Sequence, residues 1–140
     1  MAALYSGFVH ASGPYELENS YLSTASTAVA AGAALMMSSG VPTAATSGSR
    51  ILGVNVKAKL VGDATTTPLQ IFKLYTGRTE FYGPAVSSTF NTTTALGLVV
   101  DLSSAVALTT ATVTNKDFAI SQVLAGATDA KGAFVNRIFQ

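Results

Sequence analysis

The chain contains no cysteine, only one histidine and few charged residues. Without cysteine it can form neither a disulfide nor a thiolate-based zinc site, so packing alone must stabilise the fold. Charged residues make up 11% of the 140 residues, against about 25% in ordinary globular proteins. Such a chain has few groups that titrate or bind metal near neutral pH, and this scarcity argues against an enzyme.

The individual candidates for chemistry are weak. His10 has Glu16 and Glu18 as its nearest acids in the sequence, whereas a catalytic triad needs a base held on a fixed scaffold. Glu16 and Glu18 would share a strand face, where paired carboxylates can act as acid and base or bind Ca²⁺, but a solvated patch is the simpler interpretation. Four aspartates fall at expected turns, where Asp forms local hydrogen bonds: Asp63, Asp101, Asp117 and Asp129. We expect no catalytic residue, no cofactor, no metal site and no small-molecule substrate.

The charge distribution excludes further classes of function. The eight Lys and Arg residues form no run, and the net charge is +1, so we expect no binding to nucleic acid. The longest apolar-looking stretch, 22–37, is interrupted by hydroxyl residues and falls short of the ~20 residues that span a bilayer. We therefore expect no membrane segment. Residues 1–49 carry a net charge of −2 and the remainder +3, which indicates either a weak attraction between chains or chance.

Small uncharged residues are abundant: 32 are Ser or Thr and 23 are Ala. Mean hydropathy is +0.42 and 49% of residues are hydrophobic. A monomer with so little charge has weak electrostatic protection against self-association. We expect an oligomer whose surface is largely covered in use, with aggregation as the competing interpretation. The length is that of one domain.

Alternating apolar and polar residues predict strands from residue 51 onwards. In 51–60, Val54 and Val56 lie on one face and Asn55 on the other, the pattern of a half-buried strand. Gly53 within it indicates a bulge or a close backbone contact. Further strands are expected at 69–75, 79–82, 96–102, 106–113, 118–124 and 133–139. Residues 76–78 are interpreted as a hairpin turn, and 126–132 as a loop. This spacing predicts an all-β fold, a small antiparallel β-barrel or sandwich over 23–140.

The segment 24–37 is ambiguous. Its alanine content favours a helix, whereas Gly32 and the hydroxyl cluster before it disfavour one. We predict two short strands around Gly32, with a helix as the alternative. Ser38-Ser39-Gly40 then marks a turn.

Residues 1–22 have no clean period and are expected to form an extended N-terminal arm. Their aromatic side chains are candidate protein-interface residues, because aromatics on an extended segment need a groove to lie in: Tyr5, Phe8, Tyr15 and Tyr21. The alternative is that these rings pack back on their own domain.

Several blocks of sequence resemble the head decoration, or cement, proteins of tailed bacteriophages. The first two are AAGAALMMSSG at 30–40 and RILGV at 50–54. The next are TTTPLQIF at 65–72 and GRTEF at 77–81, so that the resemblance covers about residues 28–82. The chain is longer than the smallest members of that family, with extra strands expected after Gly83.

The resemblance implies a structural protein on the exterior of a virion capsid, commonly a homotrimer at three-fold positions. Its partners would be the major capsid protein and copies of itself, and it would bridge neighbouring capsid subunits against internal DNA pressure. Many identical sites on a shell multiply modest contacts by avidity. The alternatives are a self-polymerising subunit of a tail tube, fibre or surface layer, and a sugar-binding module using Tyr75, Glu80 and Tyr82.

Overall fold

The computed structural model describes residues 3–19, 28–58, 69–74, 77–86 and 88–139. Every regular element in these ranges is a β-strand, and they contain no helix that could cross a membrane. The strands are β1 (Val9–Ser12), β2 (Glu16–Glu18), β3 (Ala34–Ser38), β4 (Val41–Ala44), β5 (Gly53–Asn55), β6 (Ile71–Lys73), β7 (Glu80–Pro84), β8 (Val99–Val100), β9 (Leu102–Ser104), β10 (Ala107–Leu108), β11 (Phe118–Val123) and β12 (Asp129–Phe134). The all-β prediction is confirmed.

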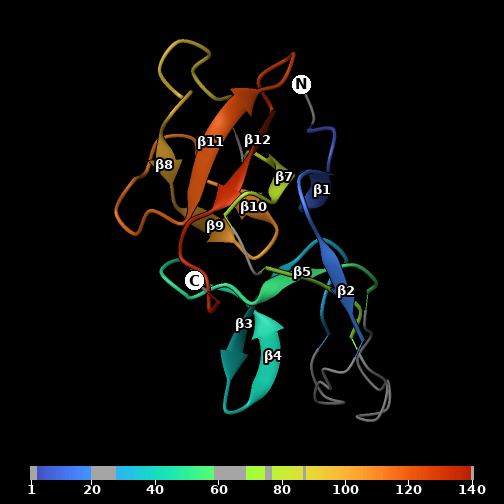
Figure 1. The fold of residues 1–140 in the computed structure, drawn as a ribbon. Coiled ribbons are helices and arrows are strands. Elements are labelled where there is room, and N and C mark those ends of the chain that lie inside the picture. The colour runs from blue at the N-terminus through green and yellow to red at the C-terminus, as the bar shows by residue number, and fades with distance from the viewer. Residues whose placement is uncertain (1–2, 20–27, 59–68, 75–76, 87, 140) are drawn as a thin grey trace.

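Two five-stranded antiparallel sheets make up most of the fold (Figure 1). The first sheet has the order β1-β7-β12-β11-β8 and the second β2-β6-β5-β3-β4, while β9 and β10 form a separate pair. Neither order closes on itself, so the part of the chain described here forms a small sandwich and no closed barrel. The β3–β4 hairpin projects from the body.

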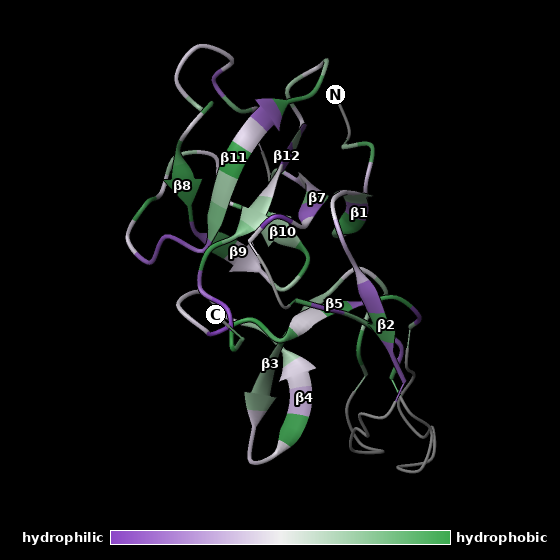
Figure 2. Cartoon of the chain, in the orientation of Figure 1, coloured by the Kyte–Doolittle hydropathy of each residue, from purple (hydrophilic) through white to green (hydrophobic). Residues whose placement is uncertain are grey.

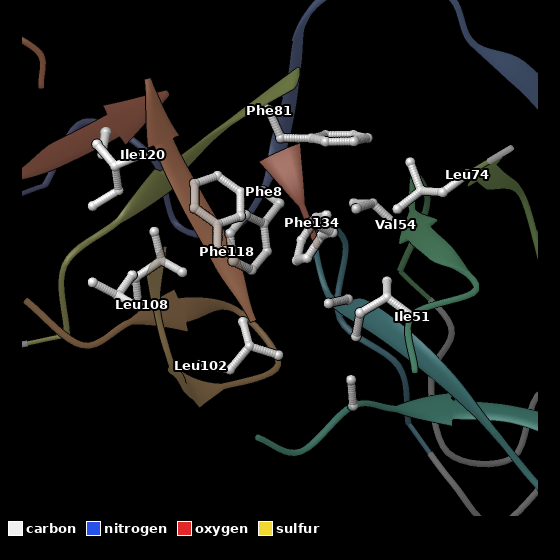
Figure 3. Close-up of a cluster of buried hydrophobic side chains, with 14 of the residues drawn as sticks. Phe8, Ile51, Val54, Leu74, Phe81, Leu102, Leu108, Phe118, Ile120 and Phe134 are labelled. Atoms are coloured by element: carbon white, nitrogen blue, oxygen red, sulfur yellow. The ribbon is translucent and has the colours of Figure 1, made fainter. Parts of the chain in front are cut away.

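An aromatic core lies between the sheets. The ring of Phe134 lies 4.9 Å from that of Phe8 and 5.2 Å from that of Phe118, in edge-to-face contacts. Ile51 and Val54, on the side of the second sheet, point toward these rings (Figure 3). Burying each such side chain contributes about 1.5–3 kcal/mol, so this cluster holds the two sheets together.

The N-terminal segment is part of both sheets. β1 pairs with β7 in the first sheet, and β2 pairs with β6 in the second. Phe8 is only 2% exposed and its amide donates a 2.8 Å hydrogen bond to the carbonyl of Gly32. The described part of 1–22 is therefore not a free arm in this structure. The alternative, packing on its own domain, is observed for Phe8, because its ring completes the aromatic core.

Residues 34–38 form a strand, as predicted for that part of 24–37, and 24–27 lie outside the described residues. The predicted turn is also present. Ser39 and Gly40 have φ of 51° and 78°, the left-handed pair of a two-residue hairpin. This turn joins β3 to β4 and fixes the register Ser38 opposite Val41.

Two predicted connections are wrong. The predicted hairpin of 69–75 with 79–82 is not formed, since β6 and β7 belong to different sheets, and Thr76 of the predicted turn lies outside the described residues. The chain crosses between the sheets there, which lets Leu74 and Phe81 both enter the same core. Residues 126–132 are not all loop either, because β12 begins at Asp129 and its apolar residues Ala130 and Phe134 are buried.

The aspartates described here do more than form local turn contacts. Asp117 is fully buried and accepts hydrogen bonds from the Ser47 hydroxyl at 2.7 Å, the Gly48 amide at 2.9 Å and the Leu102 amide at 2.8 Å. Asp101 accepts from two amides 14 and 15 residues away, at 2.8 and 2.9 Å. Buried carboxylates are tolerated where hydrogen-bond donors surround them. Asp63 lies outside the described residues.

Candidate interaction surface

The structure separates the aromatic residues that the sequence groups together. Tyr5 is half-buried and stacks on Tyr82, with ring centroids 5.2 Å apart and planes 1° from parallel. Phe8 lies in the core, whereas Tyr15 is 60% exposed. Tyr21 lies outside the described residues. Of the described three, Tyr15 alone is classed as exposed.

Exposed apolar side chains nevertheless gather on this segment. Four of the nine large hydrophobic residues exposed in the described ranges belong to it: Leu4 at 69%, Val9 at 45%, Tyr15 at 60% and Leu17 at 46%. Three of these are aliphatic, and the pattern of aromatic residues in the sequence does not point to them. Residues 4–18, here called the N-terminal edge, thus carry almost half of the large hydrophobic residues that are exposed in the described chain.

Among the described residues, the two strands of this segment are also outer strands of their sheets. β1 is the outermost strand of the first sheet and β2 the outermost strand of the second. Each has a strand neighbour on one side only among the described residues. An outer strand with exposed apolar side chains is a template for pairing with another chain.

The turn between β1 and β2 holds Tyr15 in place. Gly13 adopts a φ of 87°, and a β-carbon there would come within 2.2 Å of the Arg78 carbonyl oxygen. The Thr79 hydroxyl donates to the carbonyl of Pro14. The ring of Tyr15 then rests 5.4 Å from that of Phe72, edge to face. Because the exposed ring is already fixed, little conformational entropy is lost when a partner covers it.

Two carboxylates restrict what this edge can pair with. Glu16 and Glu18 lie on β2 on either side of Leu17, opposite Lys73 and Ile71 of β6. Figure 2 shows both hydrophilic and hydrophobic colours along β2. Antiparallel pairing of two copies of β2 would place like charges side by side, which is destabilising. The edge is therefore better suited to a different surface than to a copy of its own.

The residues considered for sugar binding do not form an open platform in the described chain. The Glu80 carboxylate accepts from the hydroxyls of Ser12 and Ser121 and lies 4.0 Å from the Lys131 ammonium. Tyr82 has one face covered by Tyr5. Tyr75 lies outside the described residues.

The described residues contain no group of three or more His, Asp or Glu side chains that could hold a metal ion. His10, the histidine singled out in the sequence, instead contacts the rings of Tyr15 and Phe72 at 5.0 and 5.5 Å. Comparisons with protein-family models, with curated proteins and with solved structures find no match to this chain.

Proposed function

We propose that the protein is a capsid decoration protein, which binds the outer surface of a viral head and bridges neighbouring major capsid subunits. The resemblance over residues 28–82 suggests the family. The observation that carries the proposal is the N-terminal edge, where exposed apolar side chains accompany two outer strands. Exposed apolar surface of this kind marks a protein–protein interface.

The low charge of the chain supports the same function. A chain in which only 11% of the residues are charged has weak electrostatic protection against association. A shell offers many equivalent sites, so a cyclic oligomer such as a trimer engages several of them at once. Each individual contact can then be weak.

Co-sedimentation with shells assembled from the major capsid protein of the same virus tests the proposal. Leu17→Ser removes an apolar side chain from the N-terminal edge, where Leu17 is 46% exposed. Leu96→Ser is the matched control, because Leu96 is 62% exposed but precedes β8, the outer strand opposite β1 in the first sheet. We expect the first change to lower the shell-bound fraction at least about tenfold and the second to leave it unchanged. Equal binding by both variants would contradict the role of the edge.

The oligomeric state of the purified protein separates the alternatives. Closed trimers without shells support a decoration protein, whereas filaments or sheets favour a self-polymerising tail, fibre or surface-layer subunit. A freely dissolved monomer that does not bind the shells would contradict both the decoration protein and the self-polymerising subunit. Sedimentation velocity and negative-stain microscopy distinguish these outcomes.

A further inference from the structure

The strand β2 ends the second sheet within the part of the chain that the structure describes. Its one strand neighbour there is β6, in a register that places Leu17 opposite Phe72. Glu16 and Leu17 are exposed. An outer strand can take up an extended segment of another chain through backbone hydrogen bonds, and its alternating side chains then select the sequence of that segment.

The two faces of β2 differ in chemistry. Leu17 is 46% exposed and lies opposite Phe72, and the ring of Tyr15 rests 5.4 Å from the same Phe72 ring. These apolar side chains therefore share one face. Glu16 and Glu18 flank Leu17, and since successive side chains of a strand point to opposite faces, both carboxylates lie on the other face. A strand added to β2 meets apolar groups on one side and negative charge on the other.

The chain itself does not supply a complementary strand. The other outer strands of the two five-stranded sheets are β1, β4 and β8, and none of them contains lysine or arginine. β4 also carries Pro42, which has no amide hydrogen to donate to a neighbouring strand. Two copies of β2 would bring like charges together. The chemistry of β2 thus favours a different protein over a second copy.

We propose that β2 pairs with an extended segment of the capsid subunit in which basic and apolar residues alternate. Lysine or arginine side chains of that segment lie opposite Glu16 and Glu18, where opposite charges stabilise cross-strand pairs. Its apolar side chains cover Leu17 and Tyr15. The alternation follows from β2 itself, whereas the assignment of the segment to the capsid subunit rests on the proposed function.

Titration of the isotope-labelled protein with the blocked peptide Thr-Val-Lys-Val-Lys-Val-Thr tests the chemical preference. We expect saturable NMR shifts and slower hydrogen exchange at the amides of residues 16–18. The same peptide with both lysines replaced by glutamate should bind at least about tenfold more weakly, because like charges then face each other. Added salt should weaken binding of the lysine peptide, since the charge pairs are exposed. Equal affinity for the two peptides would overturn the proposal.

Two N-methylated peptides test whether the backbone takes part. Successive residues of a strand direct their N–H groups to opposite edges. Methylation of either the lysine or the valine amides therefore blocks one edge of the peptide, and we expect one of the two versions to lose binding while the other retains it. Retained binding by both versions would show contact through side chains alone and would overturn the strand pairing.

A charge reversal on the protein locates the interaction. Glu16 is exposed, so Glu16→Lys should leave a dispersed amide spectrum. This variant should bind one of the two peptides with a single glutamate in place of a lysine more tightly than the original peptide. Lys116→Glu, at an exposed residue before β11 in the first sheet, is the control and should leave binding of the lysine peptide unchanged. Tighter binding by the control would show that net charge decides and would overturn the proposal.

Competition with shells tests the assignment to the capsid subunit. Excess lysine peptide should displace the protein from shells, whereas the glutamate peptide should not. If the lysine peptide binds at β2 without displacing the protein, the assignment to the capsid subunit is wrong and the chemical preference stands. If shell binding depends on Leu17 but the lysine peptide does not bind, the strand proposal is wrong and the proposed function stands.

Discussion

The carboxylate of Asp129 accepts a 2.8 Å hydrogen bond from the backbone amide of Leu4, 125 residues earlier in the chain. The same carboxylate accepts from the Tyr5 amide at 3.2 Å and from the Thr128 hydroxyl at 2.9 Å. Asp129 is 1% exposed and begins β12, a central strand of the first sheet. One buried side chain thus fastens the start of the N-terminal edge to the core.

Asp129→Asn should therefore loosen that edge. The amide nitrogen of Asn cannot accept, so at least one of the three donors loses its partner, and the free energy of unfolding should fall by about 1–3 kcal/mol. Urea denaturation measures this change. Glu16→Gln, at an exposed carboxylate, is the control and should alter stability by less than about 0.5 kcal/mol. Similar effects of the two changes would show that Asp129 does not fasten the segment.

Substitution of Phe8 should mainly lower stability, whereas substitution of Tyr15 should mainly weaken binding to shells. Phe8→Ala removes a ring from the core and should lower the free energy of unfolding by about 3–5 kcal/mol. Tyr15→Ala removes a largely exposed ring, so it should cost less than about 1 kcal/mol in stability while weakening binding to shells. Thermal melts and co-sedimentation provide the two measurements. A strongly destabilised Tyr15→Ala variant would contradict its assignment to the interaction surface.

Gly53→Ala should prevent folding or destabilise the protein severely. A β-carbon at Gly53 would lie 2.2 Å from the carbonyl oxygen of Phe72 on the paired strand, and backbone cannot move aside without breaking the sheet. Gly77→Ala is the control, since its β-carbon would meet the end of the flexible Arg137 side chain at 3.0 Å. Yield of soluble protein and circular dichroism compare the two. A well-folded Gly53→Ala protein would refute the close contact.

Ala127→Gly should stabilise the hairpin between β11 and β12. Ala127 has a φ of 58°, a conformation that costs a non-glycine residue about 1–2 kcal/mol. Relief of this strain, less the added freedom of the unfolded chain, should raise the free energy of unfolding by up to about 1 kcal/mol. Ala133→Gly, within β12, should lower it by about 0.5–1 kcal/mol. Changes of the same sign would contradict the strain argument.

Local patterns in the sequence correctly predicted features that depend on neighbouring residues. The alternation in β11 places Phe118 and Ile120 inward. The turn predicted at Ser38-Ser39-Gly40 is present, and Gly40 there has the positive φ that glycine permits. Gly53 was correctly expected to mark a close contact, since only a missing side chain allows the backbone of β6 so near. These outcomes follow from the alternation of side chains along a strand and from the steric limits of the backbone. Both can be read from a few consecutive residues of the sequence.

Features that depend on contacts between residues far apart in the sequence could not be predicted from local patterns. Asn55 has the position of an exposed polar residue in an alternating strand, yet carbonyls from residues 29–30 surround its amide. The residues next to Asp117 do not distinguish a turn-forming aspartate from a buried one, because its hydrogen-bond donors come from distant parts of the chain. The placement of the two rings depends on distant partners as well, because nothing around Phe8 and Tyr15 in the sequence tells which of them the core will take.

The pairing of β1 with β7 also bears on synthesis of the protein. Ser12 contacts Glu80 across 68 residues, which a ribosome takes about 3–14 s to add at 5–20 residues per second. For much of that interval the nascent chain carries β1 and β2, while their pairing partners β7 and β6 have not yet been synthesised. Because such non-local pairings also make folding slow, holding by a chaperone should increase the yield of native protein.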